Sequence, residues 1–259
     1  MGLDLADPGF DYSVLSKFRA RLLAGAAEMK LLDTMLEQFK AQGLLKPRGK
    51  QRTDSTHVLA AIRTLNRLES VGETLRAALN AVATVAPEWL REQAAPEWFD
   101  RYSTRIEESR LPKGQEAREQ YAELLGADGS HLLSAIYEPS APAHLRDLPA
   151  VQILRRTWVY HYYAQEGRLR WRKAEDLPPA ALRSDSPYDP EAHYGNKRSQ
   201  TWTGYKVHLT ETCDDAEVHL ITHVETTLAG VTDSELAAPI HEALAQRTLL
   251  PDEHFLDSG

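Results

Sequence analysis

Apolar side chains recur at helical spacing in the first part of the chain. In residues 11–43 two sets of apolar positions repeat at intervals of three and four, and Gly43 follows the second set. This spacing predicts two helices, and Asp11 or Ser13 is placed to cap the first. The apolar positions are Val14, Leu15, Phe18 and Leu22 in the first helix and Met29, Leu32, Leu36 and Phe39 in the second. Two helices of this length need a further surface to pack against.

Helical patterns continue beyond a short possible strand at Asp54. Apolar positions on one helical face in residues 62–82 predict a long helix that ends near Val85. Further helical pattern runs to about Ile136, and another helix is predicted over residues 150–164.

The period changes after residues 177–200, an irregular connector that contains four prolines. Residues 202–212 alternate apolar and polar side chains, which predicts a strand, and residues 217–227 follow an acidic turn as its hairpin partner. A helix is predicted over residues 231–247 and a third strand over residues 253–259. The alternating positions are Tyr205, Val207 and Leu209 on one face and Lys206, His208 and Thr210 on the other. The order of elements predicts a mixed α+β or α/β fold.

Composition describes a globular protein without a membrane segment. The chain has 259 residues, 42% of them hydrophobic, and a net charge of -8. This length can bury a sizeable core in one large domain or two modest ones. No apolar run reaches the roughly 20 residues of a membrane span and the first residues lack a signal-peptide pattern, so we expect a cytoplasmic protein with no membrane partner. The single cysteine, Cys213, excludes a disulfide within the chain.

Positive charge is concentrated in two segments despite the acidic total. From Arg146 to Lys173 the local charge is +5, and residues 46–52 carry four basic and no acidic side chains. Either run alone is typical of a solvated surface. Both lie near segments with candidate catalytic residues, so a groove that binds phosphates is the second interpretation.

Two aspartates stand in contexts that suit metal binding. Asp54 follows a basic segment in "QRTDSTHV", and Asp257 ends the last predicted strand in "EHFLDSG". Carboxylates at strand ends are common ligands of Mg²⁺. The alternatives are a helix cap for Asp54 and a turn residue for Asp257. A zinc site is disfavoured, because His219 and His223 would lie roughly 13 Å apart along one strand.

Five segments, in this order, resemble the DDE transposases of bacterial insertion sequences. They are "GFDYSVLSKFRARLL", "KQRTDSTHVLAA", "SPYDPEAHYGNKRSQTWTGYKVHLTET", "HVETTLAGVTDSE" and "LPDEHFLDSG". The resemblance covers nearly the whole chain. It implies a ribonuclease-H-like fold, a mixed sheet flanked by helices, with a first catalytic Asp on the first strand and a second on the fourth. Asp54 in "TDSTHV" matches the first position and Asp257 in "LDSG" the second, so both are the expected catalytic and metal-binding residues.

The third catalytic residue of the family, a Glu on a later helix, has no counterpart in this sequence. The resemblance therefore implies a transposase that is truncated at both ends. Residues 1–45 are expected to be the remnant of an N-terminal helical domain. Residues 46–259 are expected to form an incomplete ribonuclease-H-like catalytic domain, with a large helical insertion over about residues 60–175.

The mechanism of the family uses two Mg²⁺ or Mn²⁺ ions, held by three carboxylates, to cleave DNA strands and transfer their ends. The two-metal site is expected only in the complete family member, so we expect this chain to show no DNA nicking. A non-catalytic DNA-binding or regulatory fragment of a transposase is the alternative function. A remnant that does not fold is a third interpretation.

The resemblance also implies a partner, double-stranded DNA at the transposon ends and at the target, bound by a homo-oligomer. The candidate DNA-binding residues are Lys50, Arg52, Arg155, Arg156, Lys197, Arg198, Trp202 and Lys206. The basic side chains would contact backbone phosphates. Trp202 would either stack on a base or pack into the core.

Overall fold

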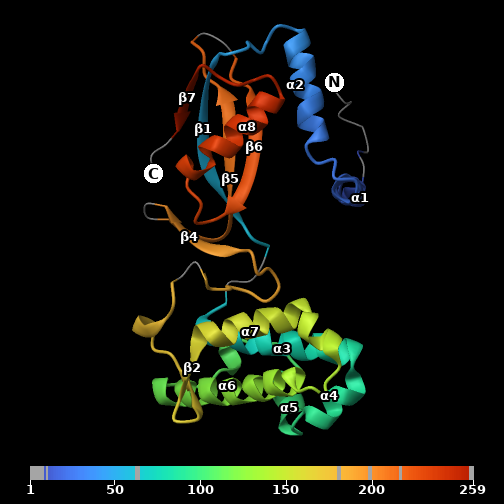
Figure 1. Cartoon of the computed structure of the whole chain (residues 1–259), viewed down its shortest axis with the longest axis vertical. Coiled ribbons are helices and arrows are strands. Elements are labelled where there is room, and N and C mark those ends of the chain that lie inside the picture. Colours follow the sequence, from blue (N-terminus) through green and yellow to red (C-terminus); the bar gives the residue numbers. More distant parts are fainter. Residues whose placement is uncertain are drawn as a thin grey trace. The chain divides into compact units, whose positions relative to one another are not determined.

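The computed structural model describes residue 9 and residues 11–61, 65–179, 182–197, 200–215 and 218–256, with the backbone alone at 197 and 200. The chain forms two compact units (Figure 1). The sheet unit comprises Met1–Ser55, His208–Glu225 and Thr232–Gly259, and the helical unit comprises Thr56–Val207 and Thr226–Val231.

These units differ from the expected domains in two respects. The first 45 residues belong to the same unit as the sheet, whereas the sequence suggested a boundary near residue 45. The helical unit, Thr56–Val207 with Thr226–Val231, is also wider than the expected insertion over residues 60–175.

Two helices open the sheet unit, as the apolar spacing predicts. They are α1 (Tyr12–Ala24) and α2 (Lys30–Ala41). The Asp11 side chain caps α1 by accepting a hydrogen bond of 2.8 Å from the Ser13 backbone N–H. α2 buries Leu36, whereas no residue of α1 is buried. The apolar positions of α1 therefore lie at the surface.

The first strand, β1 (Lys50–Leu59), is longer than the sequence suggested and holds Asp54 near its middle. This placement excludes a helix cap as the role of Asp54. The next helix, α3 (Arg67–Val85), begins later and is capped by Asn66. Asn66 accepts hydrogen bonds from the first turn of α3, and the Glu69 side chain accepts one from the Asn66 N–H, which completes a capping box.

β1 is an interior strand of a mixed sheet. The strand order is β4-β5-β1-β7, and β6 pairs with β5. The other strands are β4 (His193–Lys197), β5 (Gln200–Thr212), β6 (Ile221–Leu228) and β7 (Glu253–Leu256). β1 and β7 are parallel, whereas β4 and β5 are antiparallel. The arrows of β5 and β6 point in opposite directions (Figure 1), as expected for the predicted hairpin.

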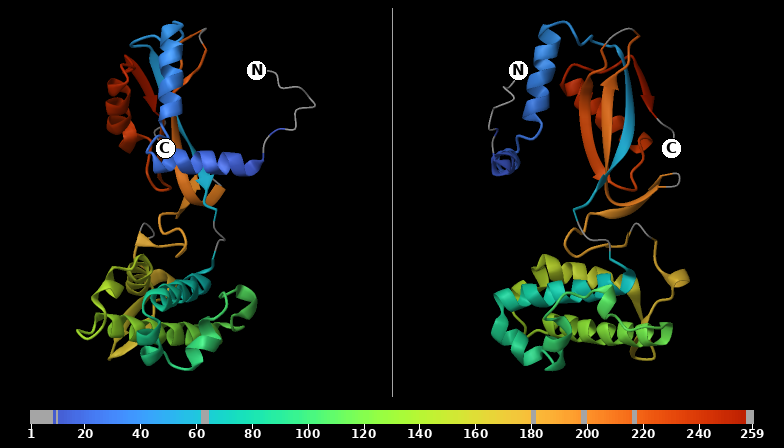
Figure 2. Two further views of the ribbon diagram at one scale, coloured as in Figure 1. Left: turned by 90° about the vertical axis from the view of Figure 1, so that its right-hand side faces the viewer. Right: turned by 180° about the vertical axis from the view of Figure 1, so that it is seen from behind.

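One helix, α8 (Ala237–Gln246), follows the hairpin and lies beside the sheet (Figure 2). A single 3₁₀ turn, Ser234–Leu236, leads into it. Ile240 and Leu244 of this helix are fully buried. The mixed sheet with a flanking helix therefore agrees with the predicted α+β class.

The helical unit is built around α3, α6 (Gln115–Tyr137) and α7 (Pro149–His161), which pack against one another. The shorter elements of this unit include α4 (Pro87–Gln93), α5 (Glu97–Tyr102), the 3₁₀ turns Glu108–Arg110, Ala143–Asp147 and Ala174–Asp176, and the strands β2 (Tyr162–Gln165) and β3 (Arg168–Trp171). β4 also falls within the residue range of this unit. Leu75 and Leu125 are among the core residues with no exposed surface. None of the described helices has the length and apolarity needed to cross a membrane.

α6 and α7 come close together because two glycines of α6 face aromatic rings. An added Cβ at Gly129 would lie 2.0 Å from the Trp158 ring, and one at Gly126 would lie 2.5 Å from Tyr162. The Trp158 Nε1–H donates to the Gly126 carbonyl at 3.0 Å. Any side chain at these positions would therefore force the two helices apart.

The helix predicted over residues 150–164 ends earlier, at His161. The residues that follow form β2, which pairs antiparallel with β3 from Tyr162 opposite Trp171 to Gln165 opposite Arg168. This short hairpin was not predicted, because the aromatic residues at 160–163 fit a helix and a strand equally well.

Candidate functional site

The candidate site centres on Asp54, an exposed residue on β1. The side chains of β1 alternate, with Gln51 and Thr53 buried and Arg52 and Asp54 exposed. The Asp54 carboxylate accepts a hydrogen bond of 2.8 Å from the Ser55 backbone N–H. β1 lies between β5 and β7, so strands on both sides fix the position of its backbone.

The register of β1 against β7 is described up to the residue that precedes each candidate aspartate. The parallel pairs run from Lys50 opposite Glu253 to Thr53 opposite Leu256. Asp54 is the next residue after Thr53, and Asp257 is the next residue after Leu256. Asp257 itself lies outside the described residues.

Two of the candidate DNA-binding cations, Lys50 and Arg52 on β1, form ion pairs with acidic residues. The Arg52 guanidinium donates from Nε to the Glu211 carboxylate on β5 at 2.7 Å, and its Nη2 lies 2.6 Å from the same oxygen. The Lys50 ammonium lies 3.5 Å from the Glu253 carboxylate. Both side chains are partly exposed, so phosphate binding at these positions would compete with an existing acidic partner.

The opposite face of the sheet, toward α8, carries a chain of hydrogen-bonded polar side chains that we call the cross-strand network. Thr53 Oγ1 lies 2.7 Å from Thr210 Oγ1 of β5 and 2.8 Å from His254 Nε2 of β7. His254 Nδ1 lies 2.8 Å from His241 Nε2 of α8. Sequence reasoning missed this network, because all five residues of "KQRTD" are polar and no alternation marks the buried ones.

The network continues across β1 to β6. The Thr222 hydroxyl donates to the Gln51 side-chain oxygen at 2.7 Å, and Gln51 Nε2 donates to the Leu249 carbonyl at 2.8 Å. Gln51 and Thr222 are buried. Buried polar groups that bond one another satisfy their hydrogen-bonding needs only in one arrangement of the strands.

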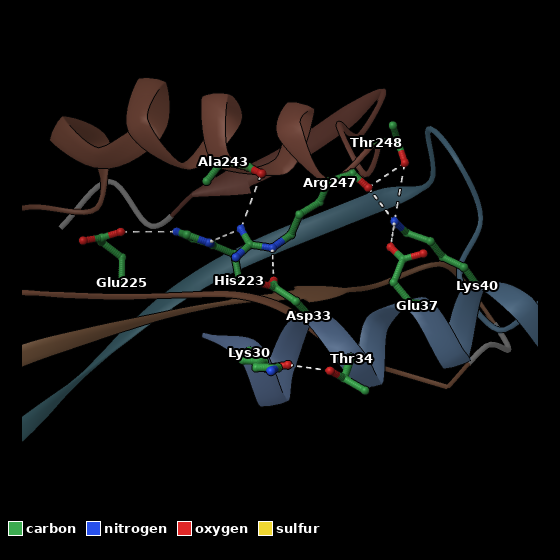
Figure 3. A network of polar contacts seen from close by, with 10 residues as sticks. All are labelled: Lys30, Asp33, Thr34, Glu37, Lys40, His223, Glu225, Ala243, Arg247 and Thr248. Carbon is green, nitrogen blue, oxygen red and sulfur yellow. Dashed lines mark hydrogen bonds and ion pairs between the residues drawn. The ribbon is translucent and has the colours of Figure 1, made fainter. Parts of the chain in front are cut away.

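A second cluster of polar side chains connects α2 with the rest of the sheet unit (Figure 3). Arg247, which directly follows α8, donates from Nε to the Asp33 carboxylate of α2 at 2.8 Å. Its Nη1 lies 3.3 Å from Nδ1 of the buried His223, and its backbone carbonyl accepts from the Lys40 ammonium at 2.6 Å. Burial, followed by the positive charge of Arg247, lowers the pKa of His223. Arg247 therefore contacts both the helix and a sheet strand.

Two more candidate DNA-binding residues have structural partners. The Trp202 side chain is buried, stacks on His57 with ring centroids 5.1 Å apart, and packs against Gly195. This geometry agrees with the core-packing interpretation of Trp202. The Lys206 ammonium donates to the Val231 carbonyl at 2.6 Å.

Exposed candidate cations are found on α7. Arg155 and Arg156 are exposed, and Arg155 donates weakly to the Tyr137 hydroxyl at 3.3 Å. Two other members of the basic segment are engaged, since Arg146 donates to carbonyls at the end of α6 and Arg170 pairs with Glu123 at 3.0 Å. The side chain of Lys197 and all of Arg198 lie outside the described residues.

The donor chemistry at Asp54 suits a hard divalent cation, because a carboxylate is the preferred type of ligand for Mg²⁺ and Mn²⁺. Within the described part of the chain, no group of three or more His, Cys, Asp or Glu side chains is placed to hold a metal ion. Burial raises the pKa of the Cys213 thiol, which disfavours the thiolate needed for a nucleophile or a zinc ligand.

The chain matches no protein-family model, none of the curated proteins and no solved structure.

Proposed function

We propose that the sheet unit binds a divalent metal ion through Asp54 and Asp257, and that these residues match the first two of the three carboxylates with which DDE transposases act on the phosphodiester backbone of double-stranded DNA. The observation that carries this proposal is the parallel register of β1 and β7, which reaches Thr53 and Leu256. We propose that the pairing extends by one more residue. The two carboxylates would then stand side by side on one face of the sheet, at the spacing of neighbouring strands of roughly 5 Å.

The order of the strands supports a ribonuclease-H-like arrangement for the sheet unit. β4 pairs only with the first residues of β5, so the central strands are β6-β5-β1-β7. Along the chain these central strands occur in the order β1, β5, β6, α8 and β7. Asp54 thus lies on the first central strand and Asp257 directly follows the fourth, which is the placement that the family resemblance implies.

The residues of the chain would contribute binding and orientation to this chemistry. A bound Mg²⁺ or Mn²⁺ ion would polarise a phosphate oxygen and help to generate an oxygen nucleophile. Asp54 would hold such an ion from a strand whose backbone is bonded on both sides, which limits its movement. Its hydrogen bond from the Ser55 N–H would orient the carboxylate.

The experiment measures Mn²⁺ binding to the full chain by electron paramagnetic resonance. Asp54→Asn and Asp257→Asn should each weaken Mn²⁺ binding at least tenfold. Asp252→Asn is the matched control, because this exposed residue precedes the other end of β7 and is 3.9 Å from Arg48. Equal Mn²⁺ affinity in the Asp54→Asn variant and the unchanged chain would refute the proposal.

A further inference from the structure

The register of β7 against β1 rests on few contacts. This strand has four residues and lies at the end of the strand order, so it has one neighbour, β1, within the described sheet. A short edge strand with few backbone pairs is the part of a sheet most prone to slip. A slip of one residue would turn each side chain of β7 to the other face.

The side chains of β7 alternate between exposed and half-buried, and none of them is fully buried, so burial alone specifies the register weakly. Phe255 is 52% exposed, and His254 and Leu256 are half-buried. The specific contact is the hydrogen bond of 2.8 Å between His254 Nε2 and the buried Thr53 hydroxyl. This bond exists only when residue 254 lies beside residues 51–53 with its ring toward α8.

We propose that Thr53 and His254 are positioning residues that lock β7 in register with β1 and so set the spacing of Asp54 and Asp257. This inference rests on the proposed function of the two aspartates. Thr53 precedes Asp54 by one residue, and His254 precedes Asp257 by three. The contact between Thr53 and His254 therefore fixes β7 against β1 close to the point where both strands reach the two aspartates.

The surroundings of Thr53 give the lock its rigidity. Thr53 is 3% exposed, and its hydroxyl has a hydrogen-bond partner on each side, Thr210 at 2.7 Å and His254. His241 on α8 orients the His254 ring through the second ring nitrogen at 2.8 Å. The bond partners therefore come from β5, β7 and α8, and each restricts the movement of the others.

The test compares two threonines of the same network. Thr53→Val removes the hydroxyl that bonds to β7, whereas Thr222→Val removes an equally buried hydroxyl from β6 and leaves the β1–β7 contact intact. Both variants should lower the melting temperature. Thr53→Val alone should weaken Mn²⁺ binding roughly tenfold, the usual effect of losing a group that orients a metal ligand. Thr53→Ser, which keeps the hydroxyl, should restore the affinity.

A second measurement reports the register without a metal. Cross-strand nuclear Overhauser contacts between the backbones of Arg52 and Phe255 should be present in the unchanged chain and in Thr222→Val, and should weaken or shift in Thr53→Val. His254→Leu removes the same hydrogen bond by changing its half-buried partner, and it should weaken or shift the same contacts. This second variant tests the inference even if Thr53→Val does not fold.

The outcomes separate this inference from the proposed function. If Thr53→Val and His254→Leu keep both the contacts and the Mn²⁺ affinity, the positioning role is wrong. If Asp54→Asn leaves Mn²⁺ binding unchanged, the proposed function is wrong, and the Overhauser contacts alone then decide whether Thr53 and His254 fix the register. A loss of affinity in Thr222→Val equal to that in Thr53→Val would also overturn the inference, because it would indicate a general loss of stability.

Discussion

His161 in the helical unit is a buried histidine whose charge state is fixed by its neighbours. It is 2% exposed, and Arg67 donates from Nε to its Nδ1 at 3.0 Å. The ring stacks on Trp171 with centroids 5.4 Å apart, and the Arg67 guanidinium lies 3.8 Å from the centroid of the same indole. Since Nδ1 accepts this bond, the proton of the neutral ring is on Nε2. Burial, followed by the charge of Arg67, lowers the pKa of His161 to about 3.

This depressed pKa predicts a loss of stability in acid. The folded-state pKa lies below the unfolded value of roughly 6.5, so the contribution of neutral His161 is complete above that pH. It decreases by about 1.4 kcal/mol for each pH unit from there toward pH 3. Urea unfolding at pH 7 and pH 4 should therefore show a smaller difference for His161→Gln than for the unchanged chain. The exposed His144→Gln is the control, and an equal pH dependence of all three proteins would contradict the prediction.

Local signals in the sequence were sufficient to predict a helix cap, but they did not indicate which residues far apart in the sequence contact each other. Asp11 was identified as a possible helix cap because capping depends on residues within one turn. Asp54 was identified from its motif. By contrast, Thr53 and His254 are 201 positions apart along the chain, and no local pattern indicates that they meet. The sequence therefore provides Asp54 as a candidate, whereas it does not indicate the groups that surround it.

At the scale of elements, regular apolar spacing predicted α1, α2, β5 and β6, whereas β1 was underestimated. α1 and α2 follow apolar spacing within their own sequence. β1 was underestimated because its buried side chains are Gln51 and Thr53, which are polar and are accommodated by hydrogen bonds to other strands and to a loop. A pattern of apolar residues does not reveal a strand whose buried face is polar.

Arg247 gives a prediction about the attachment of α2. Its side chain joins Asp33 on α2 to His223 on β6, and its carbonyl accepts from Lys40 (Figure 3). Arg247→Gln should speed amide hydrogen exchange in α2 roughly tenfold, because the loss of one charge-assisted bond weakens the docking of the helix. Exchange in the helical unit should not change.

The control for Arg247 is Glu37→Gln. Glu37 is largely exposed and pairs with Lys40 at 2.7 Å without contact to Arg247, so its loss should leave exchange in α2 nearly unchanged. If Arg247→Gln also leaves exchange in α2 unchanged, the helix is held mainly by apolar contacts such as those of the buried Leu36.

At the scale of the whole molecule, the two units use different means of stabilisation. A continuous apolar cluster lies in the helical unit and extends from Leu68 to Tyr162. In the sheet unit, the face of the sheet toward α8 carries the cross-strand network, and Ile240 and Leu244 of α8 supply apolar contacts. The sheet unit thus depends more on polar bonds, which require specific geometry, and this is the support that the proposed pair of carboxylates would need.

The distribution of charge leads to a prediction about DNA binding by the whole chain. A net charge of -8 opposes association with DNA, so binding requires a local group of cations that are free to contact phosphates. In the basic segment, Arg146 donates to carbonyls and Arg170 pairs with Glu123, whereas Arg155 and Arg156 are exposed on α7. Replacing both with Ala should weaken binding to duplex DNA. It should also reduce the slope of log affinity against log salt by up to about 1.8, because each phosphate contact contributes roughly 0.9.

Fluorescence anisotropy with a labelled duplex at several salt concentrations measures this slope. Arg91→Ala is the matched control, since Arg91 is an exposed arginine of the same unit but is held by Glu88 at 2.6 Å. Its loss should leave the slope unchanged, because an arginine already paired with a carboxylate releases few counterions from DNA. An unchanged slope in the double variant would exclude this face of α7 as a phosphate-binding surface. Contacts to DNA would then have to come from other cations, such as Arg52 on β1, which would first have to exchange Glu211 for a phosphate.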